Sequence, residues 1–91
     1  MAKLHIEHRT TLTKDVIRGK LSEIMGQIEA RYSLTGAWSG DSYTFKRKGL
    51  DGKAVISDNR VVVDMELGLL LGAFKGTIES ELRDKLKAGL P

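Results

Sequence analysis

Apolar and polar residues alternate along several short stretches of this chain, a period that is typical of half-buried β-strands. In the first stretch, Leu4 and Ile6 alternate with His5 and Glu7. The stretches with this period are residues 4–9, 34–38, 42–46, 53–57 and 61–67. Turn residues separate the last four of them, at residues 39–41, 49–52 and 58–59. Short strands joined by such turns predict an antiparallel meander, with a turn or bulge at residues 49–52.

Two longer stretches carry apolar residues at helical spacing. The first begins after Thr13, a favourable N-cap residue, and continues to about Arg31. Its apolar stripe consists of Ile17, Leu21, Ile24 and Ile28. The second extends from about Leu69 to Ala88, with a stripe of Leu71, Phe74, Ile78, Leu82 and Leu86. Because each helix has one apolar stripe, we expect both to lie across one face of the sheet.

The predicted order is therefore β-α-β-β-β-β-α, an α+β fold in a single domain of residues 1–91. The N-terminal strand is expected to pair with an edge of the meander, because a lone strand is unstable. This order is similar to half of a helix-grip domain, in which a long C-terminal helix rests in a curved sheet. Such a likeness of architecture does not by itself indicate a function.

Composition narrows the classes of protein to consider. The chain has no cysteine, which excludes disulfides and thiolate metal sites. Its N-terminal residues lack the apolar run of a signal peptide. No stretch approaches the ~20 apolar residues that a membrane-spanning helix needs. We therefore expect a cytoplasmic protein without a transmembrane segment.

The sequence contains no recognisable catalytic or metal-binding arrangement. His5 and His8 are three residues apart on a predicted strand, so they point to opposite faces and cannot share one metal ion. We interpret His8 as a core or edge residue in preference to a ligand. Asp64 and Glu66 share one face of a strand, where a solvated outer face is favoured over acid–base chemistry. We predict no enzyme activity, no catalytic residue, no metal and no cofactor.

A basic segment at residues 46–48, followed by Lys53, lies close to Tyr43 and Phe45. Basic residues next to aromatic ones are found in proteins that bind single-stranded nucleic acids. Here, however, the aromatic residues alternate with polar ones and should face the core. A charged hairpin that keeps the sheet soluble is the favoured interpretation, and no nucleic-acid partner is predicted.

Two surfaces remain as candidates for a partner. We name the first the apolar corner; it consists of Leu69, Leu70, Ala73 and Lys75. Its leucines lie outside the helical stripe, so they either fill a buried corner between strand and helix or contact an apolar partner. The second surface is the outer face of the first helix: Gly19, Ser22, Glu23, Gly26 and Ala30. Each glycine inside a helix lowers helix stability by about 1 kcal/mol relative to alanine. The two glycines are therefore either substitutions that the fold tolerates without a function, or small residues that allow close contact in a homodimer.

Several of these residues also carry a family resemblance that extends over nearly the whole chain. They are His8 and Leu12, then Trp38, Gly40-Asp41, Phe45, Gly49 and Gly52, and the closing signature Leu67-Gly68-x-Leu70-Leu71-x-x-Phe74-Lys75-x-x-Ile78-Glu79. The chain resembles the polyhydroxyalkanoic acid system (polyhydroxyalkanoate granule region) proteins of bacteria. It differs from their pattern in the first helix, where Val16-Ile17-Arg18-Gly19 stands in place of an expected Ala-Arg pair.

The resemblance implies a non-enzymatic accessory protein of polyhydroxyalkanoate storage. It would associate with granules or granule-coat proteins through the apolar corner, in the cytoplasm at the granule surface. An alternative is a small carrier of an apolar, acyl-type ligand held between the last helix and the sheet. The expected lining of that site is Trp38, Phe45, Met65, Leu71, Phe74 and Ile78. A third hypothesis is an accessory factor that binds a polymer synthase or a regulator.

Overall fold

The computed structural model describes residues 2–91 as five strands and three helices. The strands are β1 (Ala2–Arg9), β2 (Thr35–Ser39), β3 (Ser42–Arg47), β4 (Leu50–Ser57) and β5 (Arg60–Leu67). They form one sheet in the order β1-β5-β4-β3-β2, and every neighbouring pair is antiparallel. This arrangement confirms both the meander and the pairing of the N-terminal strand with its edge. Along the described residues, no helix is long and apolar enough to span a membrane.

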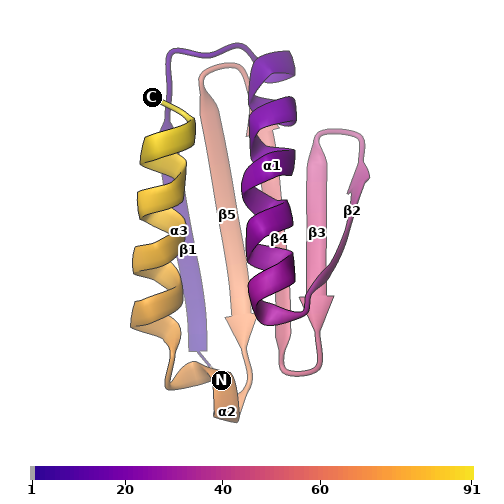
Figure 1. The fold of residues 1–91 in the computed structure, drawn as a ribbon, viewed down its shortest axis with the longest axis vertical. Helices are drawn as coiled ribbons and strands as arrows, with labels where there is room; N and C mark the ends of the chain where they lie inside the picture. The colour runs from indigo at the N-terminus through magenta and orange to yellow at the C-terminus, as the bar shows by residue number, and fades with distance from the viewer. Residues whose placement is uncertain (1) are drawn as a thin grey trace.

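The helices are α1 (Lys14–Tyr32), α2 (Leu69–Gly72) and α3 (Lys75–Gly89). Figure 1 shows α1 and α3 side by side over the same face of the sheet, as predicted. The single C-terminal helix expected from residue 69 onward is wrong, because the structure divides it into α2 and α3. At the division, the backbone N–H of Phe74 donates to the carbonyl of Leu71, three residues back, in place of the α-helical bond to a residue four back. The chain turns there, so that α3 can run back along β1.

The core lies between the sheet and the two long helices. Alternate residues of β1, β3, β4 and β5 face it, and α1 and α3 contribute their apolar stripes. Its largest fully buried side chains are Phe45, Ile6, Ile17, Leu21, Met25, Ile56, Leu67, Leu82, Leu86 and Leu90. Phe74 was expected in the stripe of the last helix, and this expectation is wrong, since Phe74 lies at the division of the helix and is 54% exposed.

The turn between β3 and β4 is shorter than the predicted interruption of residues 49–52, because β4 already begins at Leu50. Gly49 takes the left-handed conformation that the tight turn requires, with φ of 86°. Gly52 is part of the strand and lies opposite Phe45. A Cβ atom at Gly52 would stand 2.2 Å from Cε2 of Phe45, so the glycine makes room for that ring.

Antiparallel strands and helices give the molecule two distinct ends (Figure 1). One end, called the α2 end below, carries α2, the start of β1 and the β3–β4 turn. The opposite end carries the start of α1, the β2–β3 and β4–β5 turns and the last residues of the chain. The apolar corner therefore lies at one end of the elongated molecule, away from the core.

Candidate functional site

The backbone of α2 is attached at several points. The N–H of Gly68 donates to the carbonyl of Gly49 over 2.8 Å, which joins α2 to the β3–β4 turn. The helical turn itself is closed by a bond from the N–H of Gly72 to the carbonyl of Gly68, also over 2.8 Å. A Cβ at Gly72 would lie 3.5 Å from Cβ of Ala2, so the end of α2 rests against the start of β1. These contacts place α2 firmly on the end of the sheet.

The leucines of the apolar corner point away from that support. Leu69 is 90% exposed and Leu70 is 88% exposed, while Leu71 is partly buried against the core. The interpretation of Leu69 and Leu70 as a buried strand-to-helix corner is therefore wrong. In so short a helix only one of the three successive leucines can face inward, and Leu71 takes that position.

The other members of the corner are also exposed. Ala73 and Lys75 are at the surface, and the half-exposed ring of Phe74 lies between them in the chain. Phe74 was missed as a surface residue, because its spacing from Leu71 and Ile78 fits a continuous helical stripe. The two glycines near it, Gly72 and Gly76, were the available signal that the helix is interrupted.

The residues expected to line an acyl-type ligand site are not gathered around one hollow. Phe45, Met65 and Ile78 are buried in the core, whereas Phe74 is at the surface of the α2 end. Trp38 lies on the edge strand β2, where the guanidinium carbon of Arg18 is 4.5 Å from the centre of its ring. A ligand between α3 and the sheet would have to displace packed side chains. The carrier hypothesis stays a prediction without geometric support.

The outer face of α1 is open. Gly19, Ser22, Glu23, Gly26 and Ala30 are all exposed, and a Cβ at Gly19 or Gly26 would meet no atom within 4 Å. Ser22 is occupied within the chain, since its hydroxyl accepts a hydrogen bond from Nε1 of Trp38 over 3.0 Å. The homodimer through this face stays a prediction.

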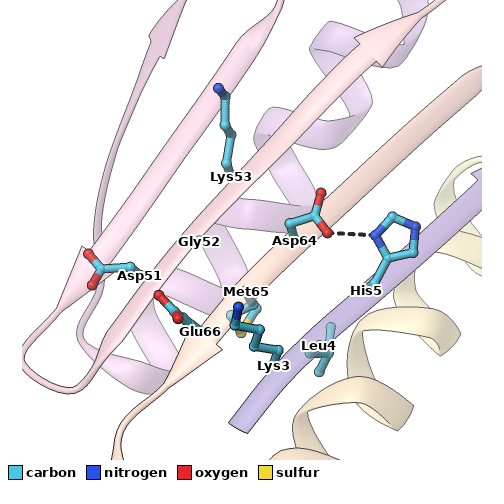
Figure 2. Close-up of a pocket in the computed structure, with 9 residues that line it drawn as sticks. All are labelled: Lys3, Leu4, His5, Asp51, Gly52, Lys53, Asp64, Met65 and Glu66. Carbon is cyan, nitrogen blue, oxygen red and sulfur yellow. Dashed lines mark hydrogen bonds and ion pairs between the residues drawn. The ribbon is translucent and has the colours of Figure 1, made fainter. Parts of the chain in front are cut away.

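The helix-free face of the sheet carries a hollow of about 540 Å³, lined by Lys3, Leu4, His5, Asp51, Gly52, Lys53, Asp64, Met65 and Glu66 (Figure 2). Charged side chains face one another across its strands, mostly in pairs of opposite sign, except that Asp51 is opposite Glu66. Nδ1 of His5 lies 2.5 Å from Oδ1 of Asp64, and Lys53 is opposite Asp64 on the other side. Cross-strand pairs of this kind are usual on a solvated sheet face. Asp64 is exposed and Glu66 partly so, in agreement with the predicted outer face.

The two histidines have separate structural partners. Nε2 of His8 lies 2.6 Å from the carbonyl oxygen of Leu90, so the ring donates a hydrogen bond that fastens the end of α3 to β1. His8 thus lies on an edge strand with a hydrogen-bond partner, in agreement with its interpretation as a core or edge residue. Among residues 2–91, no group of three or more His, Cys, Asp or Glu side chains is placed to hold a metal ion.

One partly buried polar contact was not predicted, the link between Tyr32 at the end of α1 and Glu81 on α3. The hydroxyl of Tyr32 donates to Oε1 of Glu81 over 2.7 Å, and Arg31 lies 3.4 Å from the other carboxylate oxygen. Desolvation, reinforced by the hydrogen bond and the negative charge of Glu81, raises the pKa of the Tyr32 hydroxyl. The link joins the two long helices and is separate from the apolar corner. Local periodicity gives no signal for a contact across 49 residues.

The comparison with protein families gives a match that covers nearly the whole chain. Residues 4–90 match the family model described as "Putative polyhydroxyalkanoic acid system protein" (PHA_gran_rgn). No curated protein matches the chain. Because the match extends over nearly all of the 91 residues, the chain belongs to the family of polyhydroxyalkanoic acid system proteins.

Proposed function

We propose that this protein is a non-enzymatic accessory protein of polyhydroxyalkanoate storage that attaches to the surface of storage granules through the apolar corner. The observation that carries the proposal is the exposure of Leu69 and Leu70 at 90% and 88%. Moving one leucine side chain out of water contributes about 1.5–3 kcal/mol. Two adjacent leucines can therefore supply a substantial part of the free energy of attachment to an apolar surface.

The contacts that hold α2 against the sheet support the same proposal. Its backbone is bonded to the β3–β4 turn at Gly49 and rests on Ala2, and Leu71 anchors it against the core. Leu69 and Leu70 are thus presented on an ordered base, so attachment need not order this segment of the chain. Pre-organised contacts of this kind bind more tightly than contacts on a disordered segment.

The competing hypotheses use other parts of the molecule. A carrier of an acyl chain would need space near Phe45 and Met65, and both of these side chains are packed in the core. A factor that binds a granule-coat protein or a polymer synthase could use the same leucines. Granules stripped of their proteins separate that hypothesis from direct attachment.

The proposal is tested by co-sedimentation of the purified protein with washed granules, before and after protease treatment of the granules. The variant is Leu69→Glu, which adds a charge to the corner. Because Leu69 is almost fully exposed, the free energy of unfolding of this variant should differ from that of the wild type by no more than about 0.5 kcal/mol. The matched control is Val16→Glu, which makes the same kind of change at an exposed apolar residue at the opposite end.

We expect the wild type and Val16→Glu to sediment with both granule preparations, and folded Leu69→Glu to remain in solution. The proposal is overturned if the wild type stays in solution, or if Leu69→Glu sediments as well as the wild type. Binding that disappears after protease treatment would replace direct attachment by binding to a coat protein. Thermal unfolding of each variant establishes that a loss of binding is not a loss of fold.

A further inference from the structure

The apolar corner includes one cation, Lys75, and two more cationic side chains lie beside it. Lys75 follows Phe74 directly at the start of α3. Arg47 is the last residue of β3, and Lys48 lies in the β3–β4 turn, whose Gly49 carbonyl accepts the hydrogen bond from Gly68 next to Leu69. All three cations are exposed. The same end of the molecule therefore combines the largest exposed leucines with a group of positive charges.

These cations have no acidic partner within the described chain. None of Arg47, Lys48 and Lys75 forms an ion pair with a carboxylate of residues 2–91. Arg47 donates instead to the backbone carbonyl of Tyr32 over 2.9 Å. The nearby acidic residues of the helix-free face, Asp51 and Glu66, lie opposite each other in the sheet, and each has a lysine on its other side, Lys46 and Lys3 respectively.

The opposite end of the molecule differs in this respect. There, Nζ of Lys14 lies 3.2 Å from Asp41 and the guanidinium of Arg18 lies 2.9 Å from the same carboxylate. Arg60 pairs with Glu7. Three cations of that end thus pair with carboxylates of the chain, whereas Arg47, Lys48 and Lys75 at the α2 end do not.

We infer that the apolar corner and its surrounding cations form a site for an anionic lipid interface, in which Leu69 and Leu70 enter the acyl layer while Arg47, Lys48 and Lys75 contact anionic head groups. This inference rests on the proposed function, because it uses the same surface and names the chemistry of what that surface meets. A neutral polyester surface would satisfy the leucines but would remove water from the cations without returning a charge. A layer with an apolar interior and anionic head groups satisfies both kinds of side chain.

The effect of the charges can be estimated. A lysine or arginine held close to an anionic lipid surface tightens binding about fivefold, and salt screens this attraction. Removing two of the three cations should therefore weaken binding about 25-fold at low salt. The leucine contribution should persist at high salt, because it does not depend on charge.

The test uses flotation of the full chain with vesicles of pure phosphatidylcholine and with vesicles that contain about one third phosphatidylglycerol, a surface that attracts cations. The variant is the double change Lys48→Gln with Lys75→Gln. The matched control is Lys20→Gln with Lys87→Gln, which removes the same charge from α1 and from the last turn of α3. The chain has no cysteine, so Leu70→Cys and Val16→Cys can each carry one environment-sensitive dye as a readout of insertion.

We expect binding to the anionic vesicles only, a loss of about 25-fold in the Lys48 and Lys75 variant, and little change in the control. The dye at residue 70 should report an apolar environment and the dye at residue 16 an aqueous one. Equal binding to both kinds of vesicle, equal loss in the two charge variants, or an aqueous signal at residue 70 overturns the inference. If granules bind the protein but anionic vesicles do not, the inference fails and the proposed function stands. If anionic vesicles bind it and granules do not, the proposed function fails and the lipid site stands.

Discussion

The close approach of Gly52 to Phe45 allows one stability prediction to be worked out in detail. The change Gly52→Ala adds a single Cβ atom on β4. That atom would stand 2.2 Å from Cε2 and 2.4 Å from Cζ of Phe45, well inside van der Waals contact. Phe45 is only 1% exposed, so its ring cannot move into solvent and must displace other core residues. The backbone itself is no obstacle, because Gly52 lies within a regular strand.

Two opposing terms set the size of the effect. Overpacking of a core by one carbon typically costs about 1–3 kcal/mol. Replacing glycine by alanine lowers the entropy of the unfolded chain, which returns about 0.4–1 kcal/mol. An approach of 2.2 Å places the overpacking cost in the upper part of its range, about 2–3 kcal/mol, so we expect Gly52→Ala to lower the free energy of unfolding by roughly 1–2.6 kcal/mol. For a domain of this size each 1 kcal/mol lowers Tm by about 4–8 °C.

The assay is urea unfolding followed by the fluorescence of Trp38, the single tryptophan of the chain. The matched control is Gly76→Ala on α3, where the new Cβ meets no atom within 4 Å. The control should be stabilised by about 0.5–1 kcal/mol through higher helix propensity. Adding Phe45→Leu to Gly52→Ala should recover part of the loss, so that the two changes are not additive. The packing argument would be refuted if Gly52→Ala were as stable as the wild type. It would also be refuted if the losses of stability from Gly52→Ala and Phe45→Leu simply added in the double variant.

Two further predictions concern the helices. Because the folded protein raises the pKa of Tyr32 above its usual value near 10, the unfolded chain loses that proton first as pH rises. The stabilisation by the link to Glu81, about 1.5–3 kcal/mol for a hydrogen bond to a charged group, should be complete below pH ~10 and decline above it. Chemical unfolding at a series of pH values should show this decline in the wild type but not in Tyr32→Phe, and parallel curves for the two would contradict it. Separately, we expect a homodimer through the outer face of α1, which Gly26→Lys should dissociate; sedimentation equilibrium that shows a strict monomer at high micromolar concentration would remove this hypothesis.

Most of the fold could be predicted because it depends on local periods. The alternation along β5 puts Val61, Val63 and Met65 on one side, and these are the residues that the structure buries. The turn at Asp58-Asn59 was likewise recognisable, since Asn59 takes a positive φ of 66°, a conformation that asparagine tolerates well. The stripe of α1 is buried at all four predicted positions.

The predictions that failed all concern where an element ends and what lies opposite it. Residues 69–89 carry a helical period throughout, yet the chain turns between α2 and α3. The period is unchanged by a turn at Phe74, so periodicity alone could not show that this ring leaves the core, and only Gly72 and Gly76 signalled an interruption. Similarly, the spacing of Trp38 and Phe45 indicated apolar side chains but not that the first would pack on Arg18 and the second on Gly52.

By itself the sequence determined the number of strands, the faces of the strands and long helices, and the membership of a family, because each depends on residue order or on spacing over a few positions. Only the tertiary structure decided that Leu69 and Leu70 stand in solvent, that unpaired cations surround them, and that Tyr32 meets Glu81. Periodicity states which side chains share a face of an element. Whether that face meets the core or water depends on segments far away in the chain, and their positions are set by packing of the whole domain.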